Sequence, residues 1–238
     1  MFRKFISFIN YFKIYLMRVF ILKKKIDLKK KFTLIFKFNY WLSADSKSGT
    51  GSTIESTANT RKNLDSIIKK YNIQKILDVP CGDFFWMRDF LKGQNIIYQG
   101  GDVVEELVLE LKKNHENDNK FFSNIDITKD RLPSSDLLLC RDCFIHFSNE
   151  DIIKTLINFS KSDINYFLVT HTINDTLKKN EDIYTGEYRF IDLFSEPFNL
   201  DKKTLTSFQD DPMNRQINNQ KQMSLWTKSQ IIKSLNKY

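Results

Sequence analysis

The sequence predicts an α/β domain with a mostly parallel sheet, helices on both faces of it and an antiparallel strand at its C-terminal end. First, strand-like and helix-like runs alternate between residues 75 and 170, which is typical of parallel strands joined by right-handed crossovers. Second, two strand-like runs follow near the C-terminus without a clear helix between them. Third, 238 residues with 41% apolar side chains can bury one substantial core, whereas two full domains would be tight.

Each predicted element has its own local pattern. Short runs rich in β-branched and aromatic residues predict the parallel strands, at residues 75–79, 95–101, 119–125, 135–140 and 165–170. Apolar side chains at helical spacing predict three helices, at residues 84–91, 104–114 and 149–160. Residues 204–208 and 222–227 have the pattern of two further strands. Because no clear helix separates them, we expect this last pair to be antiparallel.

A capping pattern predicts the helix that opens the domain. Ser52 and Glu55 stand three residues apart, the spacing of a capping box, in which each side chain bonds the backbone N–H of the other residue. An apolar stripe follows, so we expect a helix from this point to about Tyr71. The small and polar residues 43–52 predict a flexible loop before it.

Positive charge is concentrated at the N-terminus. The formal net charge is +8, but residues 1–37 contain eleven Lys or Arg against Asp27 alone, which is +10, so the rest of the chain sums to −2. A protein that neutralises phosphates needs cations around the site of its chemistry, and this distribution argues against a nucleic-acid partner. We predict a basic, apolar extension at residues 1–42 and a catalytic domain at residues 43–238.

The apolar run at residues 5–22 leaves three arrangements open. As an amphipathic helix it would lie on the inner membrane face, where the following lysines, from Lys23 to Lys31, would meet anionic headgroups. Alternatively, it packs on the catalytic domain or on a partner, with its lysines solvated. A span is the least favoured, because Lys13 and Arg18 each cost roughly 2.5–3.5 kcal/mol near the bilayer centre, which offsets the gain from the apolar side chains.

The cysteines predict a reducing compartment. Cys81, Cys140 and Cys143 are too few and too odd in number for a disulfide framework, which fits the cytoplasm. The C-x-x-C spacing of Cys140 and Cys143 occurs in zinc and redox sites. No second Cys or His pair stands at a matching spacing in the sequence, so we expect no metal site.

The region 76–86 reads as a strand, a tight turn and the start of a helix. In open parallel sheets ligands bind at the carboxyl ends of the strands, and Gly82 lets the backbone approach such a ligand. Asp102 closes the next strand 20 residues after Gly82, the spacing that places a carboxylate on the ribose hydroxyls of a bound adenosine. The two residues together predict a cofactor that contains adenosine.

The turn itself indicates which adenosine cofactor this is. A dinucleotide fingerprint presents G-x-G-x-x-G to a pyrophosphate, whereas this turn keeps Gly82 alone and has a carboxylate, Asp78, at its entry. Asp78 would repel a pyrophosphate and attract an ammonium group. The P-loop pattern is also absent from the sequence. We therefore expect S-adenosyl-L-methionine as the cofactor.

The turn also carries a family resemblance. Asp78 to Met87 reads D-x-P-C-G-D-F-x-W-M and resembles a bacterial group of class I S-adenosylmethionine-dependent methyltransferases. The resemblance covers about residues 48–227 and continues through residues 101–102, 126–128, 140–146, 185–189, 197–200 and 225–226. Pro80 and Phe84 depart from it, since the general family pattern has glycine at both positions.

The resemblance implies a fold and a cofactor site. The sheet would be Rossmann-like with seven strands, and Gly82 would underlie the methionine moiety. Asp102 would hold the ribose, with Asp126 and Ile127 flanking the adenine. We complete the predicted cofactor site with three further residues of the same strand ends, which are Asp78, Pro80 and Arg141.

The end of the fourth strand provides the catalytic candidates. Methyl transfer from a sulfonium requires a nucleophile held close and in line, and a base where that nucleophile must lose a proton. Asp142 follows the strand and His146 stands at the edge of the cleft, so we expect one of them to position the acceptor and remove its proton. Each also has a structural alternative, since such a carboxylate often caps a helix. His171, residues 187–189 and the loop 49–52 are further candidates for the acceptor pocket.

The sequence leaves the acceptor open as a small molecule, a lipid or a glycan. The Asn/Asp-Pro-Pro-aromatic turn that serves methylation of nucleobase amino groups is missing from this strand end, a second argument against nucleic acid. Two other function classes stay open beside a methyltransferase. One is a non-catalytic, membrane-tethered module that binds the cofactor, and the less favoured one is a nucleotide-dependent oxidoreductase.

Overall fold

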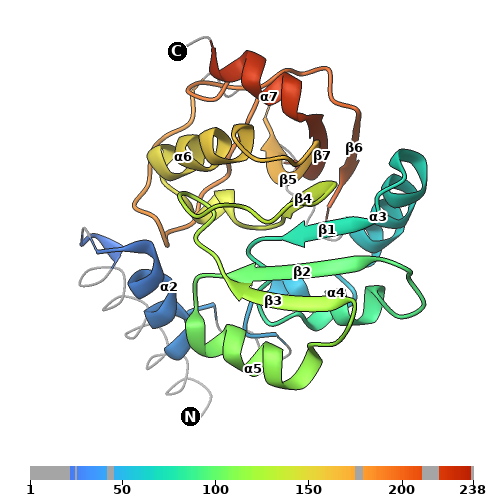
Figure 1. Ribbon diagram of the computed structural model, residues 1–238. Coiled ribbons are helices and arrows are strands. Elements are labelled where there is room, and N and C mark those ends of the chain that lie inside the picture. Colours follow the sequence, from blue (N-terminus) through green and yellow to red (C-terminus); the bar gives the residue numbers. More distant parts are fainter. Residues whose placement is uncertain (1–21, 25, 42–45, 175–178, 211–219, 237–238) are drawn as a thin grey trace.

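The computed structural model describes residues 22–24, 26–41, 46–174, 179–210 and 220–236. At its centre is a seven-stranded sheet with the order β3-β2-β1-β4-β5-β7-β6 (Figure 1). The strands are β1 (Lys75–Asp78), β2 (Ile97–Asp102), β3 (Lys120–Asn124), β4 (Leu137–Cys140), β5 (Tyr166–Ile173), β6 (Thr206–Gln209) and β7 (Gln220–Thr227).

The first five strands are parallel and the last two are not. β1 pairs with β2 and β4, and the parallel order continues to β3 at one end and to β5 at the other. β7 lies antiparallel between β5 and β6. The predicted fold class, with its antiparallel C-terminal pair, is therefore confirmed, and the strand count is the seven that the resemblance implied.

Helices cover both faces because alternate residues of each strand point to opposite sides. Ile76 of β1 belongs to the apolar cluster that packs under α3 (Ala58–Tyr71), α4 (Phe85–Phe90) and α5 (Glu105–His115). Its neighbour Leu77 belongs to the cluster under α6 (Asn149–Ser160) and α7 (Lys228–Leu235). Figure 1 shows the two groups of helices on either side of the sheet.

The helix that opens the domain begins later than predicted. Residues 50–52 form a short 3₁₀ helix, η2 (Thr50–Ser52), and α3 starts at Ala58. The expected capping box at Ser52 is wrong, because it is the Thr53 hydroxyl that accepts a hydrogen bond from Ser56 N, at 3.2 Å. The reason is a tertiary contact, since a Cβ on Gly51 would lie 2.7 Å from Asp142 Oδ2. The loop is drawn against the strand end, and this contact overrides the local capping pattern.

The described part of the N-terminal extension packs on the domain. In helix α2 (Leu28–Lys37), Lys29 and Lys37 form ion pairs with Glu105 and Glu106 of α5, at 2.6 and 3.2 Å. Figure 1 shows α2 beside α5 at this end of the sheet. Lys31 does not face outward as the membrane arrangement would require, because it is buried and its Nζ donates to Leu22 O at 3.0 Å.

The rest of the predicted apolar helix, residues 5–21, lies outside the described residues. Among the residues that the structure describes, no helix combines the length and the apolar character needed to cross a membrane.

Phe84 explains one departure from the general family pattern. It precedes α4 with a left-handed φ of 58°, the conformation that a glycine adopts without cost. In return, its ring is buried with centroids 5.1 Å from those of both Tyr98 and Phe122. Burial of the ring offsets a backbone cost of about 1–2 kcal/mol.

We therefore expect Phe84→Ala to lower the free energy of unfolding by about 3–5 kcal/mol, because it leaves a cavity and keeps the backbone strain. The matched control is Phe121→Ala on β3, whose ring is 38% exposed and whose loss should cost less than about 1 kcal/mol. Urea denaturation of the two variants and the parent measures both values. Equal losses would show that Phe84 contributes no more than a surface ring.

Candidate active site

A cavity of about 670 Å³ opens at the carboxyl ends of β1, β2 and β4. This is the edge where ligands bind in open α/β sheets. Eight of the nine residues predicted from the sequence line it, namely Asp78, Pro80, Gly82, Asp102, Ile127, Arg141, Asp142 and His146. The loop 47–52 and one face of α2 complete its wall.

Asp126 is the predicted residue that the structure does not bring to the cavity. Its Oδ1 accepts hydrogen bonds from the backbone N–H and the hydroxyl of Thr128, at 3.0 and 2.6 Å. Its Oδ2 lies 3.2 Å from Lys129 Nζ. The carboxylate therefore holds the turn after β3, and the neighbouring side chains of Ile125 and Ile127 line the cavity instead.

Two buried carboxylates, Asp78 at the end of β1 and Asp102 at the end of β2, flank the turn at Gly82. Asp78 accepts a hydrogen bond from the Tyr98 hydroxyl at 2.8 Å, and Asp102 accepts from the backbone N–H groups of Gly82 and Val104 at 3.2 and 3.0 Å. Burial raises the pKa of Asp78 to about 7 and that of Asp102 to about 6, against the lowering effect of these bonds. Both side chains thus gain from a cationic or hydrogen-bonding ligand in the cavity.

Gly82 lies where no other residue would fit. Its φ is +54°, and a Cβ there would lie 2.1 Å from the Ser48 hydroxyl oxygen. The close approach is held by Asp83, which accepts hydrogen bonds from the Ser46 hydroxyl, from Lys47 N and from the Ser48 hydroxyl, at 3.0, 2.8 and 3.2 Å. The turn and the loop 46–48 therefore close one side of the cavity together.

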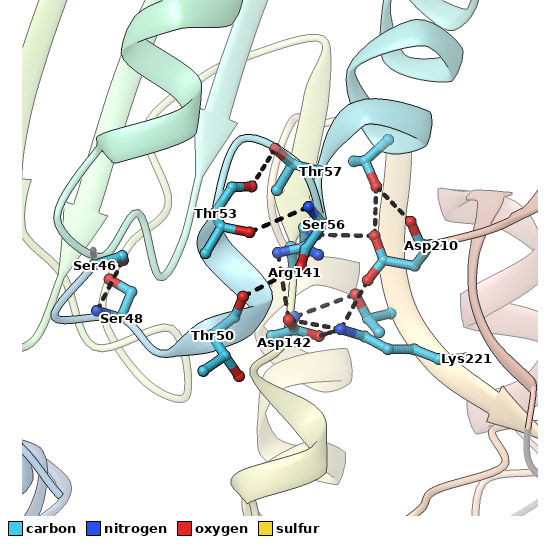
Figure 2. A network of polar contacts seen from close by, with 12 residues as sticks. Ser46, Ser48, Thr50, Thr53, Ser56, Thr57, Arg141, Asp142, Asp210 and Lys221 are labelled. Atoms are coloured by element: carbon cyan, nitrogen blue, oxygen red, sulfur yellow. Dashed lines mark hydrogen bonds and ion pairs between the residues drawn. The ribbon is translucent and has the colours of Figure 1, made fainter. Parts of the chain in front are cut away.

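A network of four charged side chains lies beside η2 (Figure 2), and three of them, Arg141, Asp142 and Lys221, form the floor of the cavity. Arg141 Nε donates to Asp210 Oδ1 at 2.9 Å, and its Nη1 lies 3.3 Å from Asp142 Oδ2. Lys221 Nζ contacts Asp142 Oδ1 at 2.7 Å and Asp210 Oδ2 at 3.0 Å. The Thr60 hydroxyl of α3 also donates to Asp210.

The network keeps the Asp210 carboxylate ionised. Burial acts to raise the pKa of Asp210, but Arg141 and Lys221 outweigh it and hold the pKa well below its usual range. Burial acts to lower the pKa of Lys221, but Asp142 and Asp210 outweigh it and raise the pKa. Asp142 is ion-paired with both cations, Arg141 and Lys221.

His146 has the geometry of a proton acceptor. Its Nδ1 lies 2.8 Å from the carbonyl oxygen of Glu187. Because a carbonyl can only accept, Nδ1 carries the proton and the lone pair is on Nε2. Burial lowers the pKa of His146, against the opposing effects of Glu187 and Asp142, so the ring is neutral at pH 7. The rings of Trp41 and Tyr188 flank it, with centroids 5.2 and 5.9 Å away.

The other acceptor-pocket candidates divide. Tyr188 and the loop 49–52 line the cavity as expected. His171 was a wrong candidate, because it is fully buried against Ser224 and Gln222, and burial lowers its pKa to about 3. Arg189 was also wrong, since it donates to Phe147 O at 2.8 Å and does not line the cavity.

Cys140 and Cys143 belong to the apolar core and are both buried. Within the described ranges, no three His, Cys, Asp or Glu side chains gather as metal ligands.

Sequence reasoning missed two groups of cavity residues. Lys221, which lines the floor, and Asp210, which holds it, carry no motif and fall just outside the strands predicted at residues 204–208 and 222–227. Phe32, Phe36 and Trp41 come from the extension. Phe32 and Phe36 are four residues apart, which indicates one helical face, but the sequence does not show that this face is turned to the cavity.

No protein-family model and no curated protein sequence matches the chain. Solved structures do match it. The methyltransferase domain of bacterial CtHen1 superimposes with a TM-score of 0.53 and 12% identity, over 74% of this chain and 100% of that one. Human N-acetylserotonin methyltransferase, in complex with SAM, gives 0.52 and 10%, over 83% of this chain and 56% of that one.

A third structure is the 1,6-didemethyltoxoflavin-N1-methyltransferase of Burkholderia thailandensis, with 1,6-didemethyltoxoflavin and S-adenosylhomocysteine bound. It gives a TM-score of 0.57 and 14% identity, over 84% of this chain and 86% of that one. Identities this low show a shared fold. The chain has the class I methyltransferase fold.

Proposed function

We propose that the chain is an S-adenosylmethionine-dependent methyltransferase of the bacterial group that its turn resembles. The observation that carries the proposal is a single cavity lined by both kinds of residue. The buried carboxylates of Asp78 and Asp102 lie beside the glycine turn at Gly82, and His146 lines the same cavity. Two proteins with the same fold were solved with SAM or S-adenosylhomocysteine bound. We propose that this chain binds the same cofactor.

The residues of the cavity fit this cofactor. Asp78 and Asp102 are costly to ionise without a partner, and the ammonium group and ribose hydroxyls of S-adenosylmethionine provide one for each. Gly82 leaves room for the methionine backbone. Ile127 offers an apolar surface to the adenine, and Arg141 a positive charge to the carboxylate.

When bound, S-adenosylmethionine supplies a methyl group on a positively charged sulfur. His146 removes the acceptor's proton at Nε2, where its lone pair lies. Asp142 is a positioning residue in this scheme, because its ion pairs with Lys221 and Arg141 fix the floor beside His146. The acceptor belongs to the classes expected from the sequence, a small molecule, a lipid or a glycan.

Cofactor binding should weaken as the pH falls, because the cofactor's ammonium requires an ionised Asp78. In the free protein the pKa of Asp78 is raised to about 7, so its charge is present above that pH and lost below it. We expect the Kd for S-adenosylhomocysteine to rise about tenfold per pH unit below 7, and more steeply below the pKa of Asp102, about 6. Isothermal titration calorimetry from pH 8 to 5.5 measures this.

The variant Asp78→Asn tests the assignment. At pH 8 it should lose a charge-assisted hydrogen bond, about 1.5–3 kcal/mol of binding, and its Kd should no longer change near pH 7. Asp163→Asn, at an exposed position, is the control and should follow the parent. A parent and an Asp78→Asn variant with the same pH profile would remove Asp78 from the cofactor site.

The catalytic proposal is tested by His146→Gln, which removes the basic nitrogen. We expect turnover to fall by about 10²–10⁴, while the affinity for S-adenosylhomocysteine stays unchanged. The measurement is transfer of label from methyl-labelled S-adenosylmethionine to the soluble and lipid fractions of a cell extract. His115→Gln, on α5 and outside the cavity, is the matched control and should keep the parent rate. Parent turnover by His146→Gln would show that the acceptor needs no base here.

A further inference from the structure

The half of the cavity around His146 is walled by aromatic side chains. Trp41 and Tyr188 lie against the imidazole, with centroids 5.2 and 5.9 Å away. The ring of Phe32 on α2 lies 6.4 Å from Trp41, and the ring of Phe190 lies 5.6 Å from Tyr188. All of these rings line the same cavity. They make a surface suited to a flat apolar ring, since aromatic pairs add stability beyond area burial.

The polar edge of Trp41 is buried in the protein and is not open to the cavity. Its indole N–H is buried and has no acceptor among the described residues. Buried indole N–H groups usually find a partner. In Trp41 this N–H is closed off by the protein, so the contact that Trp41 offers to a ligand is its apolar ring.

Building on the proposed methyl transfer, we propose that the acceptor is a small molecule with a hydroxylated aromatic ring. The ring lies against Trp41 and Tyr188, and its hydroxyl meets Nε2 of His146. Trp41 and Tyr188 are then specificity-determining residues, and the first belongs to the extension before the catalytic domain.

The chemistry of the base favours a phenol over a sugar hydroxyl. Burial lowers the pKa of His146, so it removes a proton best from an acidic donor, and phenols have a pKa of about 10. A sugar would also bring several hydroxyls that need partners, and the α2 wall of Leu28, Phe32 and Phe36 offers none from its side chains. In the transfer, the phenolic oxygen bonds the methyl carbon, the sulfur keeps the electron pair of the broken bond, and the proton passes to His146.

Binding of a probe tests the inference apart from turnover. The full chain is saturated with S-adenosylhomocysteine and titrated by calorimetry with 2,3-dihydroxynaphthalene or with methyl α-D-glucopyranoside. We expect the first probe to bind and the second not to bind. Trp41→Ala and Tyr188→Ala should each weaken the first probe about tenfold, as the loss of a ring contact predicts, and leave the S-adenosylhomocysteine affinity unchanged.

Tyr184→Ala is the matched control, because Tyr184 is 53% exposed, as Tyr188 is 56% exposed, but lies outside the cavity. It should bind both ligands like the parent. Trp41→Phe keeps a smaller ring, and we expect an intermediate loss of affinity for the naphthalene diol.

The outcomes separate the two proposals. If S-adenosylhomocysteine does not bind, the proposed function fails. If it binds but the naphthalene diol does not, or binds equally well to Trp41→Ala and Tyr188→Ala, the aromatic acceptor is overturned while the methyltransferase stands. Tighter binding of the glucoside than of the diol would likewise overturn it in favour of a glycan. Methylation of the diol by the parent, detected by mass spectrometry, would support it further.

Discussion

The buried charge network of Arg141, Asp142, Asp210 and Lys221 is the constraint on which the site depends. Charges away from water must be paired, and removal of one partner leaves an uncompensated charge that costs several kcal/mol. Here the pairing ties the end of β4 to the ends of β6 and β7, and Thr60 adds α3. The strand ends are thereby held in one arrangement, with η2 pressed against Asp142.

The cavity that results has two unlike halves. Buried carboxylates and a glycine turn form the half at β1 and β2, which suits a charged, polar cofactor. Aromatic rings form the half at α2 and residues 188–190, which suits an apolar partner. His146 belongs to the second half, whereas Asp142, four residues earlier in the chain, belongs to the network at the floor. The junction of the two halves is therefore where a transferred group would pass.

Environment separates the two catalytic candidates that the sequence left equal. Asp142 and His146 stand four residues apart after the same strand, and either could accept a proton in water. Lys221 and Arg141 neutralise Asp142, whereas the Glu187 carbonyl fixes the tautomer of His146 and leaves Nε2 with its lone pair. Arg141 adjoins Asp142, whereas the Glu187 carbonyl and Lys221 come from other parts of the chain, 41 and 79 residues away in sequence.

The sequence by itself determined the fold and the half of the cavity at β1 and β2, because both depend on local patterns. Helix α6 begins and ends as its apolar spacing predicted, β1 differs by one residue, and Asp78, Gly82 and Asp102 line the cavity as their strand-end positions required. Tertiary structure alone decided the rest. The loop before α3 contacts Asp142, and α3 begins later than predicted. The carboxylate of Asp126 accepts a hydrogen bond from Thr128 and does not face the cavity. His171 is buried where β5 pairs with β7. Tertiary structure also brought Trp41 and Lys221 to the cavity. Their side chains contact His146 and Asp142, in segments that no local periodicity connects.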